Sequence, residues 1–232
     1  MSQIIPQVGT PENEHSRRLF LRRAGSVAIM GTAAAVLLSS ATPAKAVATS
    51  PRDKQRYRIQ NGQFTDIMGH ENDHVAYLVS ALGADARPKP SFAPLLQKNI
   101  VDFVTVSQAL ENTGVGAYLG ALGVISSSDY VTAAGTIAQI EARHAGYLNN
   151  LVEDPITGNI LDLSTNNSFE MPLTVAQVVA AAGPFVTSLN GGPPLTFSTT
   201  PSPANDIAIL NFALALEYLE AEFYNMNVPK FF

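Results

Sequence analysis

The sequence predicts an all-α fold arranged as a four-helix bundle, and three observations lead to this prediction. Four long stretches carry apolar residues at the spacing of an α-helix. No stretch shows the period-two alternation of a half-buried strand. The chain has 232 residues, of which 46% are hydrophobic, so it can bury a core. Four long helices in a chain of this size favour a bundle.

Start and stop residues bound the expected helices. The first stretch ends at Gly83, a residue typical of a helix end. A run of serines before Asp129 marks the start of the third helix. Ser202 followed by Pro203 marks the start of the fourth, because proline is favoured at the first helical position. We therefore expect helices over residues 64–82, 92–122, 129–152 and 203–227.

A long irregular segment, residues 153–202, separates the third and fourth helices and is dominated by Asn, Thr, Gly and Pro. It contains one short helix candidate at 173–182, where Thr174 and Gln177 would form a capping pair and Gly183 the stop. A loop of this length is unusual in a compact domain, so we expect it to pack as a lid or belt.

The N-terminal segment resembles a twin-arginine export signal. Arg17 and Arg18 precede an apolar, alanine-rich stretch, and Ala44-Lys45-Ala46 is a small-residue cleavage site. The alternatives are a retained membrane anchor or a chance arginine pair, but the apolar stretch is shorter than the ~20 residues that a span needs. We expect export to the periplasm or cell envelope. The chain then divides into a signal peptide (1–46), an extended lead-in (47–62) and one helical domain (63–232).

Composition and charge exclude several functions. The formal net charge is −5, with 14 Lys and Arg against 19 Asp and Glu, and no basic run persists beyond the first quarter of the chain, so no nucleic-acid partner is expected. No stretch after the signal could span a bilayer. The absence of cysteine excludes disulfides, thiolate nucleophiles and iron–sulfur clusters. A metal would therefore be bound by histidine and carboxylate side chains.

A repeated motif carries the chemistry. The pattern Glu-x-x-His-x-x-Tyr-Leu occurs in both the first and the third predicted helix. Residues three apart on a helix are neighbours, so Glu71 can act with His74, and Glu141 with His144. Both pairs lie on the apolar stripe of their helix, which should face the core of the bundle.

The other two helices each place a single glutamate on the apolar stripe, with a tyrosine seven residues on: Glu111 with Tyr118, and Glu217 with Tyr224. We expect both tyrosines to pack in the core with a partner for the hydroxyl. An ionised carboxylate taken out of water costs on the order of several kcal/mol even after relaxation. Two divalent cations would balance the four inward carboxylates, and the two histidines would add nitrogen ligands. Such oxygen-rich sites suit iron or manganese, whereas zinc usually takes fewer ligands.

The blocks GHENDHVAYL, ALENTGVGAYLGAL, IEARHAGYL and NDIAILNFALALEYLEAEFY together resemble the bacterial ferritin-like domain proteins related to plant desiccation-related proteins. In ferritin-like di-iron and di-manganese proteins, two helices supply one Glu each and the other two supply Glu-x-x-His. The resemblance implies a ferritin-like bundle with a site for two iron or manganese ions. It assigns the metal ligands to Glu71, His74, Glu111, Glu141, His144 and Glu217.

The order of the helices departs from that family. The helix at 205–224 matches the family's first helix but comes last here, which implies a permuted order. We expect the segment 153–202 to lead the chain back so that the last helix closes its own bundle, because lengthening a loop costs little. The alternative is a homodimer in which the last helix is swapped into a neighbouring chain.

Three other polar residues near the motifs are expected to matter less. His70 could share a zinc ion with His74, but no third ligand is suitably spaced, so we expect His70 beside the ligands or exposed. Glu220 and Glu222 are expected on a solvated face, with Glu220 as a fallback ligand three residues after Glu217.

Two functions fit these features. The first is an exported ferritin-like protein whose dinuclear iron or manganese centre acts in O2 or peroxide chemistry or in iron oxidation, and so protects against stress. The second is a structural stress or envelope protein of the desiccation-related kind, without catalytic activity, in which any metal only holds the fold. Metal content separates the two.

Overall fold

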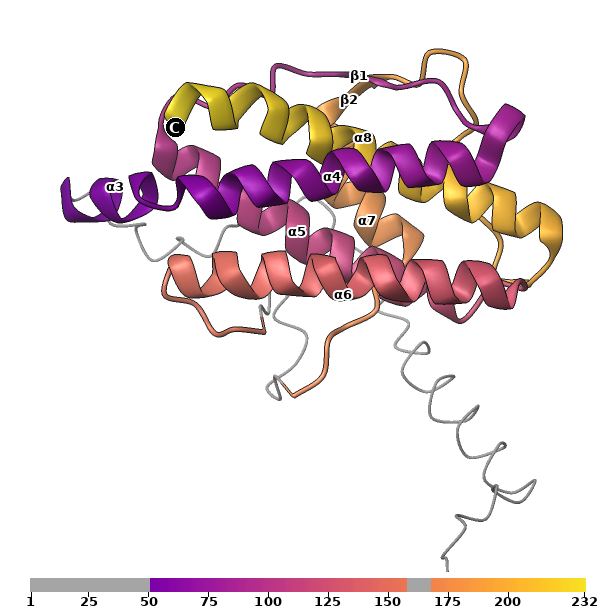
Figure 1. Ribbon diagram of the computed structural model, residues 1–232. Coiled ribbons are helices and arrows are strands. Elements are labelled where there is room, and N and C mark those ends of the chain that lie inside the picture. Colours follow the sequence, from indigo (N-terminus) through magenta and orange to yellow (C-terminus); the bar gives the residue numbers. More distant parts are fainter. Residues whose placement is uncertain (1–50, 158–167) are drawn as a thin grey trace, which may run out of the picture. The chain divides into compact units, whose positions relative to one another are not determined.

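The computed structural model describes residues 51–157 and 168–232. Four long α-helices make up most of this part (Figure 1): α4 (Asn61–Leu82), α5 (Ile100–Leu122), α6 (Ser128–Leu151) and α8 (Pro203–Phe231). The shorter elements are the helices α3 (Pro51–Arg58) and α7 (Val175–Ala182), the 3-10 turns η1 (Gly83–Asp85) and η2 (Gly183–Phe185), and the strands β1 (Ser91–Phe92) and β2 (Val186–Ser188). The expected signal peptide, 1–46, and part of the long loop lie outside the described residues.

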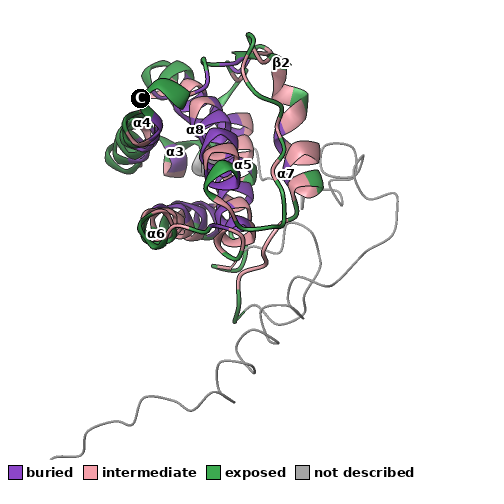
Figure 2. Ribbon diagram, turned by 90° about the vertical axis from the view of Figure 1, so that its right-hand side faces the viewer, coloured by how far each residue is buried: buried purple, intermediate pink, exposed green. Residues whose placement is uncertain are grey.

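The four long helices pack as a bundle, as predicted. α4 lies along α8, α5 lies along α6, and α5 and α8 contact each other between these pairs. Figure 2 shows that α5 and α8 are buried on most sides, whereas α4 and α6 keep an exposed side. α8 packs against α4 and α5 of the same chain and so completes the four-helix arrangement within it.

Local signals set several helix ends where the sequence predicted them. Ser127 and Ser202 cap α6 and α8 through their side chains. Thr174 and Gln177 form the expected capping box of α7. α4 ends at Gly83, whose φ of 55° lies in the left-handed region that glycine adopts without strain.

The lead-in that was expected to be extended is helical over α3 instead. The side chain of Tyr57 is buried in the core, so tertiary packing holds this segment. Arg56 and Arg58 lie in the last turn of α3, where positive charge is favourable. The segment is short and highly charged, so its sequence has no apolar pattern from which this helix could be predicted.

The second long helix begins at Ile100 and not at Phe92. Asn99 caps it, and Pro94 disfavours helix in the residue before it. Phe92 lies instead in β1, where it pairs with Val186 of the antiparallel strand β2. Strands this short carry no periodicity, so the sequence did not indicate them.

Part of the long segment packs as a belt, residues 171–174, across α5. The Leu173 amide donates a hydrogen bond to the Gly116 carbonyl oxygen, with an N···O distance of 2.8 Å. A Cβ atom at Gly116 would collide with the Leu173 side chain, and one at Gly120 with the Leu173 backbone. The glycines of α5 therefore admit a second chain segment at close range, and the prediction that the loop packs as a belt is confirmed for this part.

The hydrophobic core is divided along the bundle by buried charged groups. One part contains Phe64 and Phe223, and the other contains Leu78 and Leu214. On both α4 and α8 buried glutamates lie in sequence between these two parts. Among the helices of the described residues, none is long and apolar enough to cross a membrane.

Candidate metal centre

The two Glu-x-x-His motifs place their side chains in the interior of the bundle, as predicted. Glu71 and His74 are buried on α4, and Glu141 and His144 are buried on α6. Both glutamates are 0% exposed, and each lies one helical turn before its histidine. α5 and α8 add Glu111 and Glu217, which are also 0% exposed. The structure thus brings all six predicted ligands into one cluster.

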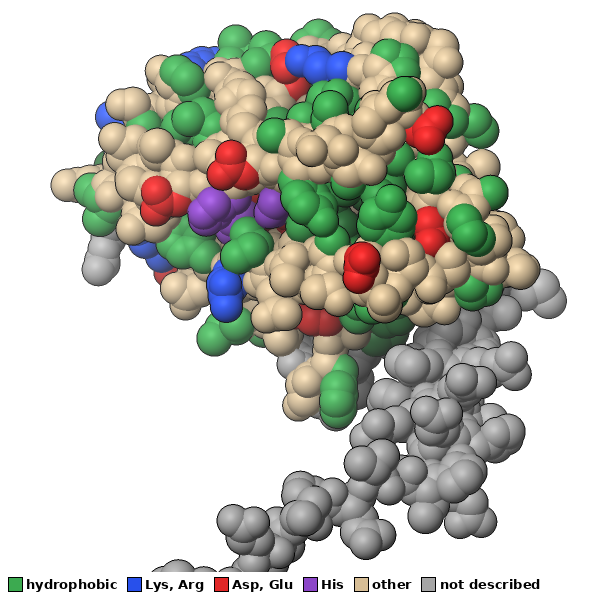
Figure 3. Space-filling model, turned by 45° about the vertical axis from the view of Figure 1, so that its right-hand side comes forward, with side chains coloured by type: hydrophobic (Ala, Val, Ile, Leu, Met, Phe, Trp, Pro, Cys, Tyr) green, Lys and Arg blue, Asp and Glu red, His purple; other side chains and the backbone are tan. Residues whose placement is uncertain are grey.

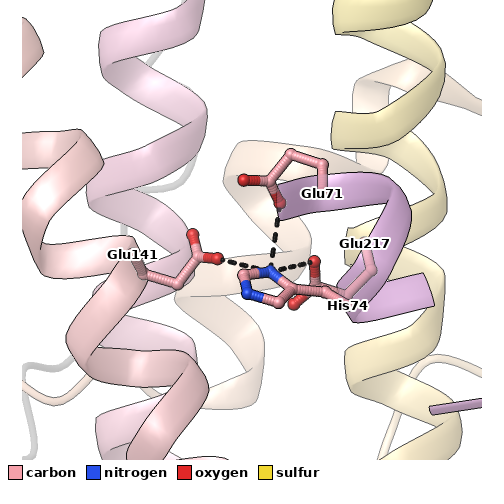
Figure 4. Close-up of side chains that lie close together, drawn as sticks. All are labelled: Glu71, His74, Glu141 and Glu217. Carbon is pink, nitrogen blue, oxygen red and sulfur yellow. Dashed lines mark hydrogen bonds and ion pairs between the residues drawn. The ribbon is translucent and has the colours of Figure 1, made fainter. Parts of the chain in front are cut away.

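Three of the carboxylates converge on one histidine nitrogen (Figure 4). His74 Nδ1 lies 3.2 Å from Glu141 Oε1, 3.2 Å from Glu217 Oε2 and 3.4 Å from Glu71 Oε2. These four residues come from α4, α6 and α8 and can place one ligand atom each within 4.8 Å of one another. They form the first of two candidate sets of metal ligands.

The second set is centred on His144. Its Nδ1 atom lies 3.0 Å from Glu71 Oε1 and 3.1 Å from Glu111 Oε2. Glu141 completes this set, whose ligand atoms also lie within 4.8 Å of one another. Glu71 and Glu141 therefore belong to both sets, and each set has one histidine and one further glutamate of its own.

The shared carboxylates lack donors of their own. Among the described residues, no oxygen of Glu71 or Glu141 has a hydrogen-bond donor other than the two histidines, although all four oxygens are buried. Tyr118 and His74 bond to Glu217, and Tyr224 and His144 bond to Glu111. A buried carboxylate without a donor is costly. The two shared residues are thus suited to bind cations, and carboxylate oxygen and imidazole nitrogen are both donors that hold divalent metal ions in proteins.

The pKa values of the cluster reflect the excess of buried negative charge. Burial raises the pKa of Glu217 to about 7 and that of Glu141 well above its usual range. Burial alone would also raise the pKa of Glu71, but attraction to His144 and His74 outweighs it and lowers the pKa to about 2. Burial opposes the charged form of His74 and His144, yet the surrounding glutamates raise both pKa values to about 10. Protons thus balance part of the negative charge, a role that divalent cations can take over.

The tyrosines of the second repeat bind across the bundle. The Tyr118 hydroxyl of α5 donates to Glu217 Oε1 of α8, and the Tyr224 hydroxyl of α8 donates to Glu111 Oε1 of α5 at 2.6 Å. Both tyrosines are buried, so the prediction of core residues with a hydroxyl partner is confirmed. Each tyrosine orients the glutamate of the opposite helix.

His70 lies beside the ligands on the exposed side of α4. Its Nδ1 atom is 2.9 Å from His144 Nε2, and the two rings are parallel with centroids 5.2 Å apart. The expectation that His70 is a neighbour of the ligands is confirmed. Its contact occupies the outer nitrogen of His144 while the inner nitrogen faces the carboxylates.

Glu220 corrects the sequence analysis, which expected it on a solvated face. It is 4% exposed, and burial raises its pKa well above the usual range. Glu222, by contrast, is partly exposed and pairs with Lys89. The reason is that α8 is covered on most sides, so a residue away from the main stripe is still buried. Apolar residues on every side of α8, such as Leu219 and Phe223, were the signal for this.

Gly114 is a second feature that sequence reasoning missed. A Cβ atom at this position of α5 would lie 2.7 Å from Glu141 Oε2 and 3.5 Å from Glu220 Oε1. A glycine in the interior of a helix was the available signal, because it often marks a close approach. Gly114 makes room for one of the two shared carboxylates.

Comparison with known proteins identifies one family. The family model described as a ferritin-like domain matches residues 23–154 and 205–231, which is more than half of the chain. All six predicted ligands lie inside the matched residues. Neither a curated protein nor a solved structure matches the chain.

Proposed function

Because this chain belongs to the ferritin-like domain family, we propose that it is an exported protein that binds two iron or manganese ions and uses them in O2 or peroxide chemistry or in iron oxidation. The single observation that carries the proposal is the pair of overlapping ligand sets. Their two shared glutamates, Glu71 and Glu141, are fully buried and have no hydrogen-bond donor other than the two histidines among the described residues.

Each ion would take one histidine, one glutamate of its own and the two shared glutamates. His74 and Glu217 would serve one ion, and His144 and Glu111 the other. Iron or manganese bound here would supply reversible one-electron chemistry toward O2, peroxide or ferrous iron.

The chain's own residues keep the ligands in place and exclude water. Tyr118 and Tyr224 hold Glu217 and Glu111 through their hydroxyl groups. The apolar parts of the core on both sides of the cluster keep bulk water away from it. A low-dielectric surrounding of this kind strengthens each ligand's interaction with a cation.

Elemental analysis of the purified protein tests the proposal. We expect about two iron or manganese ions per chain, as in other bundles with this ligand pattern. Replacing Glu71 and Glu141 together by alanine should abolish metal binding, because each ion loses both shared carboxylates. The same samples should be assayed for peroxide consumption and for oxidation of ferrous iron.

A matched pair of variants on α8 tests the assignment of ligands. Glu217→Gln removes a charge from the first ligand set and should lower metal content. Glu220→Gln should change it little, because Glu220 belongs to neither ligand set. Both side chains are buried on the same helix, so a general packing effect would change both variants equally.

A native protein that is folded but free of metal would contradict the proposal and favour the structural stress or envelope protein of the desiccation-related kind. Loss of metal from Glu220→Gln but not from Glu217→Gln would instead shift the ligand register of α8 by one turn.

The exported location is part of the proposal and has its own test. The motif around Arg17 and Arg18 supports the twin-arginine pathway, and a metal centre is best loaded before a folded protein crosses the membrane. Replacing both arginines by lysine should leave the precursor in the cytoplasm. Undiminished export of that variant would contradict this route.

A further inference from the structure

The two ligand sets of the candidate metal centre match each other closely. Each contains one histidine, the two shared glutamates and one glutamate of its own. In each set a tyrosine from the opposite helix holds the glutamate that is not shared, Tyr118 for Glu217 and Tyr224 for Glu111. A further residue that contacts only one of the sets should therefore make the two ion positions unequal.

His70 contacts only the set centred on His144. Its Nδ1 atom lies 2.9 Å from His144 Nε2, and the two rings are parallel with centroids 5.2 Å apart. Nitrogens of parallel rings with this centroid separation can come so close only if the rings lie nearly in one plane, edge to edge. The hydrogen bond then runs along the lone pair of the accepting nitrogen, which is the favourable direction.

His74 has no such partner in the part of the chain that the structure describes. All its polar contacts there are made by the inner nitrogen, Nδ1. His70 directly precedes Glu71 in the motif of α4. The residue at the matching position of the α6 motif is Ile140, whose side chain cannot accept a hydrogen bond. The asymmetry thus follows from one difference between two otherwise matching motifs.

The carboxylates decide which of the two histidines donates. The inner nitrogen of His144 faces Glu71 and Glu111, so the proton on that nitrogen is the one that is released when a cation binds to these carboxylates. The outer nitrogen keeps its hydrogen and donates it to Nδ1 of His70. A partner of this kind fixes the tautomer and the ring orientation of a histidine ligand, and its loss typically costs about 10- to 100-fold in metal affinity.

We propose that His70 is a positioning residue for His144, so that the ligand set centred on His144 binds its ion more tightly than the set centred on His74. This inference rests on the proposed function, because it concerns how the two ion positions fill. His70 is exposed on α4, and histidine side chains reach the surface beside acidic side chains on the face seen in Figure 3. A substitution of His70 therefore leaves the core of the bundle unchanged.

Two substitutions of similar shape test the role of His70. Asparagine places a carbonyl oxygen close to the position of Nδ1 and so keeps the acceptor, whereas leucine lacks it. The full chain, freed of metal by a chelator, is titrated calorimetrically and without oxygen, with Mn(II) and with Fe(II). The unaltered protein should bind its ions in two steps. His70→Leu should weaken the tighter step by about tenfold or more and change the weaker step little, and His70→Asn should retain most of the tighter binding.

A double-mutant cycle shows whether His70 acts through His144. In a protein that carries His144→Ala, adding His70→Leu should change the remaining metal binding little, because the hydrogen-bond donor is already absent. In a protein that carries His74→Ala, adding His70→Leu should still weaken the tighter step by about tenfold or more. Equal effects of His70→Leu in both backgrounds would overturn the proposal.

Proton NMR of the imidazole N–H groups in the metal-free protein gives a readout that does not depend on metal. The Nε2 hydrogen of His144 should exchange slowly with solvent in the unaltered protein and in His70→Asn, and faster in His70→Leu. An unchanged tighter step in His70→Leu, or an equal loss in the leucine and asparagine variants, would overturn the role of His70 and leave the metal centre standing. Absence of binding of either ion to the unaltered protein would refute the metal centre and this inference together.

Discussion

Gly114 determines how much space the carboxylate of Glu141 has within the cluster, because glycine has no side chain. Apart from its contact with His74, Glu141 has no polar partner among the described residues, so the space around it strongly influences where its carboxylate lies. That space is available because α5 has no Cβ atom at this point. The geometry of a buried ligand thus depends on a residue that contributes no chemistry.

Gly114→Ala should therefore lower metal content while leaving the fold intact. The added Cβ would lie 2.7 Å from Glu141 Oε2, and the flexible carboxylate can move away at little cost to the fold. Gly135→Ala is the control, because nothing lies within 4 Å of a Cβ there. It should stabilise α6 by about 0.5 to 1 kcal/mol through helix propensity. Metal content and the urea midpoint of both variants check the prediction, and unchanged metal content in Gly114→Ala would contradict it.

Asp206 joins the start of α8 to the segment before α6, and its ionisation leads to a prediction about pH. Its Oδ1 accepts a hydrogen bond from the Ser126 amide, and its Oδ2 accepts from the Ser126 hydroxyl and the Ser127 amide. Burial alone would raise the pKa of Asp206, but these hydrogen bonds lower it below the ordinary value of 3.8. The ionised form therefore stabilises the folded chain above pH 3.8, and this contribution is lost as the pH falls through the lowered pKa.

Asp206→Asn should lower the free energy of unfolding at pH 7 by about 1 to 3 kcal/mol, the range for a hydrogen-bonded charged group. The difference from the unaltered protein should stay constant down to about pH 4 and shrink below it. Urea unfolding at both ends of this range measures it. A difference that grows on acidification would refute the argument.

At the scale of elements, the contact between α5 and the belt explains why α5 contains several glycines. The belt donates a backbone hydrogen bond to α5 at Gly116, and its backbone passes directly over Gly120. Glycine in the interior of a helix costs roughly 0.5 to 1 kcal/mol relative to alanine. This cost is offset because the belt can then pack against α5.

Gly120→Ala should therefore destabilise the protein, by about 1 to 3 kcal/mol as for other overpacked sites. The new Cβ meets the Leu173 carbonyl, which is backbone and yields less readily than a side chain. Gly123→Ala, at the C-terminal end of the same helix, has nothing within 4 Å and serves as the control. Thermal unfolding compares the two, and equal midpoints would show that the belt does not pack on α5 in solution.

For the bundle as a whole, α8 is the element that joins the two halves. It contacts both α4 and α5 and supplies one glutamate of the cluster. Its Asn211 accepts hydrogen bonds from the backbone amide and the guanidinium group of Arg87, which lies after the end of α4. It is also the last of the described helices in chain order. The stability of the bundle and the completion of the site therefore depend on the same element.

Deleting everything after Ser202 should cause aggregation and loss of metal. The three remaining long helices would expose the apolar stripes that α8 covers, around a cluster that has lost Glu217. Size-exclusion chromatography and elemental analysis measure the two effects. The intact chain carrying Glu217→Gln is the control for the charge alone, and it should stay monodisperse. A soluble, metal-loaded truncated protein would show that α8 is not part of the site.

The local pattern of the chain was sufficient for the four long helices and for the inward position of the candidate ligands. Helical periodicity, caps such as Ser127 and Ser202, and the three-residue spacing of Glu and His act between residues that are neighbours along the chain. Each of these features is confirmed in the bundle, including the inward position of all six predicted ligands. The permuted helix order and the export signal stay predictions.

Contacts between distant segments decided the rest. Tyr57 makes α3 a packed helix, α8 buries Glu220 on what its own pattern suggested was a solvated side, and Leu173 crosses α5 where Gly116 and Gly120 allow it. A sequence records which face of a helix is apolar, but how many neighbours cover that helix depends on elements far away along the chain.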